Sequence, residues 1–202
     1  MSRLFGTDGA RGIANSELSC ELAMNIGRAA AMVLISDNCG EKPVVFIGKD
    51  TRLSSDMLEG ALTAGLCSVG ANVVHLGIVP TPAVAYLVKK HKASAGIMIS
   101  ASHNPHEFNG IKIFNSDGYK LPDALEDKIE SIILDNAVPF PVPTGAGLGK
   151  SMILPEAVDE YINHIAESID IDLSGLKVAV DCSNGSASRT AEKLFTKLGA
   201  DF

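Results

Sequence analysis

The chain has 202 residues, of which 46% are hydrophobic and 20% charged, and its net charge at pH 7 is −7. This composition is typical of a globular protein, and the length leaves room for one or two domains. The acidic balance argues against a nucleic-acid or membrane-surface partner, and no apolar stretch is long enough to cross a membrane.

Four cysteines, Cys20, Cys39, Cys67 and Cys182, show no C-x-x-C spacing. Isolated cysteines of this kind are typical of free thiols rather than of a metal or redox site. The N-terminus lacks a basic segment followed by a long apolar run, so we expect no secretory signal. The sequence therefore favours a cytoplasmic protein in a reducing compartment.

The first segment, residues 3–12, ends in a glycine-rich loop that holds Thr7, Asp8 and Arg11. Glycines permit unusual backbone angles and the close approach of an anion. The planar guanidinium of Arg11 suits phosphate oxygens, which makes it a candidate phosphate clamp. The alternative is an ordinary surface arginine in a flexible loop.

Helical and strand-like patterns alternate through the next 115 or so residues. The first predicted helix is capped by Ser19 and ended by residues 37–40, and a strand over 43–48 follows it. Next come a helix over 55–69, with Gly70 as its C-terminal cap, and a strand over 73–77. A short helix capped by Thr81, with Pro82 at its first position, precedes a strand over 97–99, an apolar segment over 109–114 and a helix from Pro122 to 134. This order predicts an α/β fold with a mixed, largely parallel sheet flanked by helices.

A loop of small and polar residues follows the apolar run 97–99, and it contains Ser100, Ser102, His103 and Asn104. Ligands of open α/β sheets bind beyond the carboxyl ends of the strands. Ser102 offers a hydroxyl, His103 a hydrogen-bond donor and Asn104 a side chain that stabilises a turn. A serine phosphate ester with cationic neighbours is one chemistry that such a loop supports.

Three further cationic residues, Lys112, Lys49 and Arg52, lie at positions from which they can contact the same loop. Lys112 interrupts an apolar segment, so it is expected to point away from the core. Lys49 and Arg52 directly follow the strand 43–48, and Asp50 is placed to orient one of them by a salt bridge. We expect Lys49 and Arg52 to hold the Ser102 loop or to contribute positive charge near it, rather than to act directly in catalysis.

Local chemistry alone leaves a simpler alternative open, namely that Ser100 to Pro105 form an ordinary turn. Neighbouring serine and histidine side chains diverge, and no third triad member is at hand. His75 alternates with apolar residues, which indicates a packed or edge histidine rather than a ligand.

Proline and glycine dominate residues 136–154, which predict a linker between a first domain, 1–135, and a second one, 155–202. The second part predicts a helix over 155–169, a strand over 177–181, a loop over 182–185 and a helix over 188–198, with 199–202 leading into another strand. One strand and two helices cannot close a doubly wound sheet, so we expect an incomplete second α/β domain.

Three segments together resemble the α-D-phosphohexomutase family, and the similarity runs over essentially the whole chain. They are the Ser100–Pro105 loop with Asn109–Lys112, the opening Phe5–Gly12, and Gly48–Arg52. The compact N-terminus and these segments are most similar to the bacterial members of the family that act on glucosamine phosphates.

The resemblance implies that phosphorylated Ser102 interconverts glucosamine 6-phosphate and glucosamine 1-phosphate through a 1,6-bisphosphate. It implies Arg11, His103 and Lys112 as further catalytic residues and Ser100, Asn104, Lys49 and Arg52 as phosphate-binding or loop-supporting ones. Members acting on glucose or mannose phosphates, or a non-catalytic phosphosugar-binding module, are the alternatives.

The resemblance also implies one Mg²⁺ ion, bound by the phosphoryl oxygen of Ser102 and by an aspartate-rich loop that is not in this sequence, so its other ligands are expected beyond residue 202. Glucosamine or glucose 1,6-bisphosphate is implied as an activator, and a homodimer is a possible assembly. The 202-residue chain alone is expected to have little or no turnover.

Overall fold

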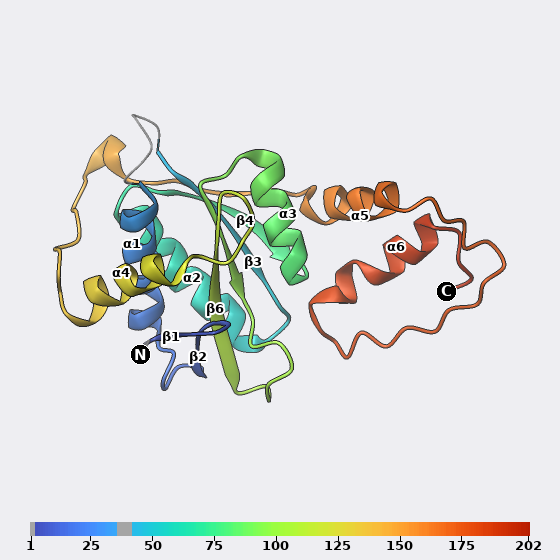
Figure 1. Ribbon diagram of the computed structural model, residues 1–202, viewed down its shortest axis with the longest axis horizontal. Helices are drawn as coiled ribbons and strands as arrows, with labels where there is room; N and C mark the ends of the chain where they lie inside the picture. Colours follow the sequence, from blue (N-terminus) through green and yellow to red (C-terminus); the bar gives the residue numbers. More distant parts are fainter. Residues whose placement is uncertain (1–2, 36–41) are drawn as a thin grey trace.

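The computed structural model describes residues 3–35 and 42–202. Cys39 and the predicted helix end at 37–40 lie outside these residues. One seven-stranded sheet forms the centre of the molecule, in the order β1-β2-β6-β5-β3-β4-β7 (Figure 1). Its strands are β1 (Phe5–Gly6), β2 (Gly9–Ile13), β3 (Val44–Lys49), β4 (Asn72–Ile78), β5 (Ala95–Ile99), β6 (Phe108–Asn115) and β7 (Ser151–Ile153).

The two halves of the sheet differ in strand direction. Strands β5, β3, β4 and β7 run parallel, whereas β6, β2 and β1 continue the sheet in antiparallel pairs. The helices that connect the parallel strands lie on its faces, as right-handed crossovers require. The predicted class, a mixed α/β sheet flanked by helices, is confirmed.

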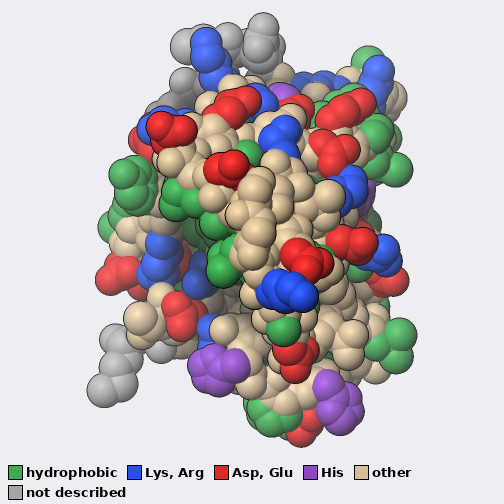
Figure 2. Space-filling view, turned by 90° about the vertical axis from the view of Figure 1, so that its right-hand side faces the viewer, with side chains coloured by type: hydrophobic (Ala, Val, Ile, Leu, Met, Phe, Trp, Pro, Cys, Tyr) green, Lys and Arg blue, Asp and Glu red, His purple; other side chains and the backbone are tan. Residues whose placement is uncertain are grey.

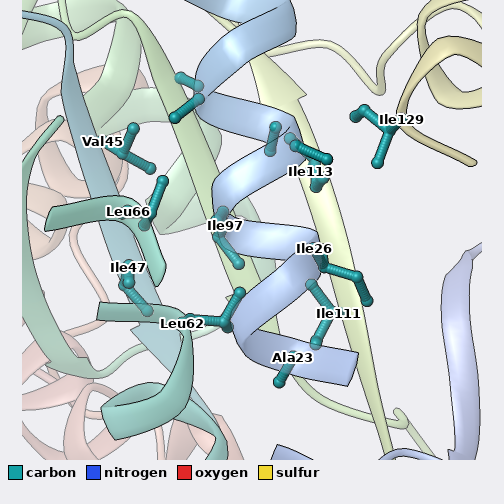
Figure 3. Packing of buried hydrophobic residues seen from close by; sticks show 14 of the residues in the cluster. Ala23, Ile26, Val45, Ile47, Leu62, Leu66, Ile97, Ile111, Ile113 and Ile129 are labelled. Carbon is teal, nitrogen blue, oxygen red and sulfur yellow. The ribbon is translucent and has the colours of Figure 1, made fainter. Parts of the chain in front are cut away.

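One face of the sheet is covered by three helices, α1 (Cys20–Ile35), α2 (Leu53–Ser68) and α4 (Asp123–Leu134). Their apolar sides meet alternate strand residues in a core that Figure 3 shows from close by. Ile97 and Ile111 are fully buried there, in the same cluster as Leu62 and Leu66 of α2. Burial of such side chains stabilises a fold by about 1.5–3 kcal/mol each.

The opposite face is covered by α3 (Thr81–His91) and α5 (Ala157–Ser168). Gly48 and Gly96 let α3 approach the strands, because a Cβ at either position would meet Val84 within 2.8 Å. Tyr161 of α5 is buried in the same cluster. Helix α5 therefore packs on the sheet that the preceding residues build.

The N-terminal segment differs from its prediction as a loop. Residues 9–13 form β2, which pairs with β6, and only Thr7 and Asp8 remain as a turn between two strands. Gly9 has φ +92°, and a Cβ there would lie 2.3 Å from the carbonyl oxygen of Ile111. Glycine is thus required at this turn, and Arg11 lies on a strand instead of in a flexible loop.

Two predicted helix details also differ. Helix α3 begins at Thr81, with Pro80 as its N-cap, so Pro82 occupies the second helical position and Thr81 makes no capping hydrogen bond. A proline fits there because the first turn has no intrahelical use for its N–H. For α1, the prediction is confirmed, since the Ser19 hydroxyl accepts a hydrogen bond from the Leu22 N–H at 3.2 Å.

The proline- and glycine-rich stretch contains regular structure that its composition does not indicate. Residues 145–147 form a 3-10 turn, η1, and β7 adds a parallel edge strand beside β4. Lys42 holds the turn by donating to the carbonyl oxygens of Ala146 and Leu148 at 2.5 and 2.6 Å. The second half of this stretch is therefore attached to the rest of the domain by these contacts.

The C-terminal residues extend away from the sheet beyond α5 and include η2 (Ser186–Arg189) and α6 (Ala191–Lys197) (Figure 1). The strand expected over 177–181 is not formed, and a single parallel bridge joins Lys177 to Asp201. Parallel strands are stable only when partners flank them and helices cover them, and this segment is largely exposed. Acidic, basic and hydrophobic side chains are interspersed over this end of the molecule (Figure 2).

Within residues 3–35 and 42–202, no helix combines the length and the apolar character that a bilayer crossing needs.

Candidate functional site

A cleft of about 850 Å³ opens at the carboxyl edge of the parallel strands. One side is formed by the segments that follow β3 and β5, and the other by residues 182–187. Asp50 and Ser100 lie next to each other in this wall, because the Asp50 N–H donates to the Ile99 carbonyl at 3.0 Å. The predicted site residues that line the cleft are Ser100, Ser102, His103, Asn104 and Arg52.

The N-termini of two helices open into the same cleft. Leu53, the first residue of α2, and Thr81, the first residue of α3, both line it. Helix N-termini carry unpaired N–H groups and the positive end of the helix dipole, which attract anions. The β3–α2 and β4–α3 connections thus place two anion-attracting helix N-termini at the opening of the cleft, although the protein as a whole is acidic.

The backbone of Ser102 is held in an unusual conformation, with φ +57°. A left-handed conformation costs a residue other than glycine about 1–2 kcal/mol. Two contacts fix it: the Ser102 N–H donates to the Ser100 hydroxyl at 3.0 Å, and Arg52 donates to the Ser102 carbonyl at 3.0 Å. The loop therefore presents the Ser102 side chain to solvent at a defined position.

The hydroxyl of Ser102 lies 3.4 Å from Nδ1 of His103, beyond the usual length of an O–H hydrogen bond. Both side chains are exposed. This geometry is not that of a serine activated by a histidine base. It leaves both groups free to contact a phosphoryl group.

The guanidinium group of Arg52 supports the loop through hydrogen bonds. Its two terminal nitrogens donate to four carbonyl oxygens of the loop at 2.6–3.0 Å, those of Ser102, Asn104, Pro105 and Phe108. Its Nε donates to Asp50 at 3.0 Å. These contacts use all five N–H donors of the guanidinium. Arg52 therefore shapes the loop and has no donor left for a phosphate.

A buried polar network behind Arg52 was not predicted. The Ser55 hydroxyl donates to Asp50 at 2.8 Å, and the Asn109 amide donates to Ser55 at 3.1 Å. Asn109 and Ser55 are fully buried. The sequence contains a signal for this network, because Ser55 and Asn109 are polar residues within apolar helix and strand patterns. Buried polar groups are nearly always hydrogen-bonded to a partner.

Lys49 lies away from the loop that it was expected to support. Its ammonium group pairs with Glu59 and, at 2.6 Å, with Asp56, both on α2. Burial alone lowers the pKa of Lys49, but hydrogen bonds to the two carboxylates outweigh it and raise the pKa. His75 joins this group through its 2.8 Å contact with Glu59, as expected of a packed histidine. The expectation fails for Lys49 because its side chain leaves β3 toward α2.

Arg11 and Lys112 lie on neighbouring strands next to the Ser102 loop. Arg11 pairs in register with Gly110, whose carbonyl accepts the Ser100 N–H at 2.9 Å. Lys112 is two residues further along β6 and therefore on the same face. The structure brings these two predicted residues together beside the loop, although they do not line the cleft itself.

Asp8 connects these two cations. Its carboxylate lies 3.3 Å from Nη2 of Arg11 and 3.3 Å from Nζ of Lys112. The hydrogen bond from Lys112 and the charges around it lower the pKa of Asp8. The sequence placed Asp8 in the glycine-rich loop but gave it no role.

The second wall of the cleft, residues 182–187, was predicted only as a loop. The Thr51 hydroxyl donates to the Asn184 carbonyl and joins this wall to the segment after β3. A smaller cavity of about 380 Å³ lies beside that contact, between Thr51 and Arg189. The available signal was a polar loop directly after the apolar run 178–180, since the segments after β3 and β5 in the other wall also follow apolar runs.

No three histidine, cysteine, aspartate or glutamate side chains among residues 3–35 and 42–202 lie close enough together to hold a metal ion. Ser102 can contribute one oxygen through a phosphoryl group. The described residues therefore do not form a magnesium site by themselves.

Comparison with protein families matches residues 2–138 to domain I, an alpha/beta/alpha domain, of phosphoglucomutase/phosphomannomutase. The chain belongs to this family. The phosphoglucosamine mutases of Acetivibrio thermocellus and Clostridium novyi are 57% and 54% identical over 201 residues, which is 100% of this chain and 44% of theirs. The chain thus spans less than half the length of these curated relatives.

Solved structures of the phosphoglucomutase/phosphomannomutase family have the same fold. A family protein from Burkholderia thailandensis superposes with a TM-score of 0.82 at 29% identity, covering 98% of this chain and 42% of that one. A protein described as a putative phosphomannomutase from Thermus thermophilus gives 0.71 at 27% identity, covering 88% and 39%. The resemblance found in the three sequence segments is confirmed.

Proposed function

We propose that this chain is the phosphoserine-bearing part of a phosphohexomutase that interconverts glucosamine 6-phosphate and glucosamine 1-phosphate. The observation that carries the proposal is the Ser102 loop. An exposed serine is held in a left-handed conformation by Ser100 and Arg52, at a mouth where two helix N-termini converge. Identity of 57% to a phosphoglucosamine mutase supports glucosamine as the sugar.

In the proposed reaction, the bond between phosphorus and Ser102 Oγ breaks while phosphorus bonds to the 1-hydroxyl oxygen of glucosamine 6-phosphate. The sugar hydroxyl loses its proton, and Ser102 ends as a protonated hydroxyl. The resulting 1,6-bisphosphate reorients and returns its 6-phosphoryl group to Ser102. Each transfer is helped mainly by positioning and by neutralising charge on the phosphoryl oxygens.

The cations beside the loop supply that neutralisation in the proposal. Arg11 uses one of its five donors, on Asp8, and Lys112 one of its three, so both have donors for phosphoryl oxygens. His103, adjacent to the hydroxyl, would donate to the same group, and Lys112 can carry the proton. Ser100, Asn104 and Arg52 hold the loop through the hydrogen bonds described above, and Lys49 takes no part.

Mg²⁺ is proposed as the metal of this reaction, with one phosphoryl oxygen on Ser102 among its ligands, and it would neutralise charge on the transferring group. The described residues offer no further ligand cluster for this ion. Glucosamine or glucose 1,6-bisphosphate is proposed as the activator that first loads Ser102. We further propose a cytoplasmic location, which the free thiols of Cys20, Cys67 and Cys182 favour, and a homodimer.

Phosphoryl loading of Ser102 tests the proposal directly. The protein at its natural length is incubated with glucosamine 1,6-bisphosphate and Mg²⁺, and its intact mass and modified residue are determined. We expect one phosphoryl group on Ser102 and none in Ser102→Ala. Ser116→Ala is the control, because it removes an exposed serine hydroxyl in the turn after β6, at the end of that strand far from the loop, and should still load Ser102. Loading on another residue, or no loading, would contradict the proposal.

Turnover on three sugars separates the alternatives within the family. Glucosamine phosphate should be converted faster than glucose or mannose phosphate; the reverse order would identify a phosphoglucomutase or phosphomannomutase. Loading without turnover in the natural-length protein would indicate a phosphosugar-binding module. The 202-residue chain by itself is expected to show little or no turnover.

A further inference from the structure

Asp8 occupies an unusual place for a carboxylate in a site built for anions. Its two oxygens face two different cations, with Oδ2 3.3 Å from Arg11 and Oδ1 3.3 Å from Lys112. Both contacts are longer than the 2.7–2.9 Å typical of a hydrogen bond between ionised groups. Asp8 is more than half exposed, and neither cation has another carboxylate partner among the described residues.

The backbone fixes this arrangement. Gly9 makes the turn that places Asp8 beside β6, and the β2–β6 register sets Arg11 opposite Gly110. Arg11 and Lys112 therefore lie on one face of the sheet with the carboxylate between them. A bridge of two oxygens between two cations is also the way in which a phosphoryl group binds such a pair.

We propose that Asp8 is a built-in competitor for phosphate, which occupies the Arg11–Lys112 pair in the empty site and weakens the hold of that pair on phosphoryl groups. The inference rests on the proposed function, because a bisphosphate that reorients must release each of its phosphoryl groups from these cations in every cycle. A cationic pair without a competing carboxylate would bind the ground state more tightly. Tighter ground-state binding slows release without helping the transfer itself.

Binding of inorganic phosphate tests this role without any turnover. The measurement is calorimetry on the natural-length protein in a Ser102→Ala background, so that the loop carries no phosphate in any variant. Asp8→Asn removes the competing charge and is expected to bind phosphate about fivefold more tightly, the effect of one unit charge at about 4 Å in water. Asp8→Glu keeps the charge and is expected to stay close to the parent affinity.

Two further variants assign the effect to the pair. Asp123→Asn is the matched control, since Asp123 is also an exposed carboxylate paired with a lysine, at 3.1 Å, but lies at the start of α4. It should leave phosphate affinity unchanged. In Arg11→Ala, the added Asp8→Asn change should give little gain, because one of the two cations is gone.

Three outcomes overturn the inference. Weaker phosphate binding in Asp8→Asn would mean that Asp8 only holds the cations in place. Unchanged binding would mean that it does not compete, and an equal gain in Asp123→Asn would mean a general charge effect. Unfolding curves of each variant confirm that the fold is intact. Failure of Ser102 to accept a phosphoryl group would reject the proposed function, whereas the phosphate affinities would still be measured.

Discussion

Arg52 and Arg11 both lie next to the Ser102 loop, and they differ in how many of their donors the protein already uses. Arg52 donates five hydrogen bonds to Asp50 and to loop carbonyls, and its side chain is 11% exposed. Arg11 makes one 3.3 Å contact, with Asp8, and is 29% exposed. The same side chain therefore serves as scaffold when its donors are satisfied and remains available for a ligand when they are not.

The largest effect on stability is expected from Arg52→Ala. The change leaves the buried Asp50 carboxylate without its cationic partner and four loop carbonyls without their donor. Removing one partner of a buried ion pair costs about 3–5 kcal/mol. We expect the free energy of unfolding to fall by about 3 kcal/mol, measured as a lower urea midpoint.

Arg52→Lys is the control for this prediction. An ammonium group retains the charge but has only three donors and no planar fork, so it cannot reach four carbonyls at once. It should recover only a small part of the loss. Full recovery would show that charge, rather than the pattern of donors, supports the loop.

The placement of Arg11 depends on a second buried carboxylate, which gives the next largest effect. Glu130 on α4 accepts hydrogen bonds from the N–H groups of Arg3, Leu4 and Phe5 at 2.7–3.1 Å and thereby fixes β1 beside β2. Glu130→Gln keeps the shape but loses the charge that strengthens these bonds. We expect a loss of about 2 kcal/mol in unfolding free energy. An unchanged urea midpoint would mean that β1 is held by its strand pairing alone.

Lys49 is a third cation near the site, and it differs from both arginines. The sequence predicted that it supports the loop, whereas in the structure it pairs with carboxylates of α2. Burial alone would raise the pKa of Glu59, but hydrogen bonds from His75 and Lys49 outweigh it and lower the pKa below its ordinary value of 4.5. A lowered folded-state pKa adds stability above the unfolded value, and this stability is lost as pH falls through the folded value.

Glu59→Gln should therefore destabilise the protein at pH 7 by about 1.5 kcal/mol, the lower end of the range for a hydrogen bond to a charged group. The difference from the parent protein should shrink as the pH falls below 4.5. Urea midpoints at several pH values measure it. A difference that stays constant from pH 7 to pH 3 would contradict the assigned cause.

The sequence predicted the alternating part of the fold well, because each helix or strand between residues 19 and 134 has a clear apolar period. It failed where structure depends on distant partners. Strand β2 forms through its pairing with β6, and β7 through its pairing with β4, although their own compositions indicate loops. Residues 177–181 have a strand-like composition but pair only through one bridge.

The same limit applies to the site. Position after a strand identified Ser102, Arg52 and Lys49 together, since all three follow or end parallel strands. The direction of each side chain then separates them: Arg52 turns to the loop, whereas Lys49 turns to Glu59. Side-chain partners of this kind depend on the packing of α2 against the sheet, which no local pattern contains.

The smallest effect on stability and the largest on chemistry are expected from Arg11→Ala. Because one exposed contact with Asp8 is lost, the free energy of unfolding should change by less than about 0.5 kcal/mol. The rate of Ser102 loading by the bisphosphate should fall about a hundredfold, as it does when a donor to a transition-state oxygen is removed. Arg11→Lys should restore part of the rate, since it returns the charge without the fork. If loading stayed fast in Arg11→Ala while the urea midpoint fell, Arg11 would be a scaffold residue like Arg52, and the number of unused donors would not distinguish the two roles.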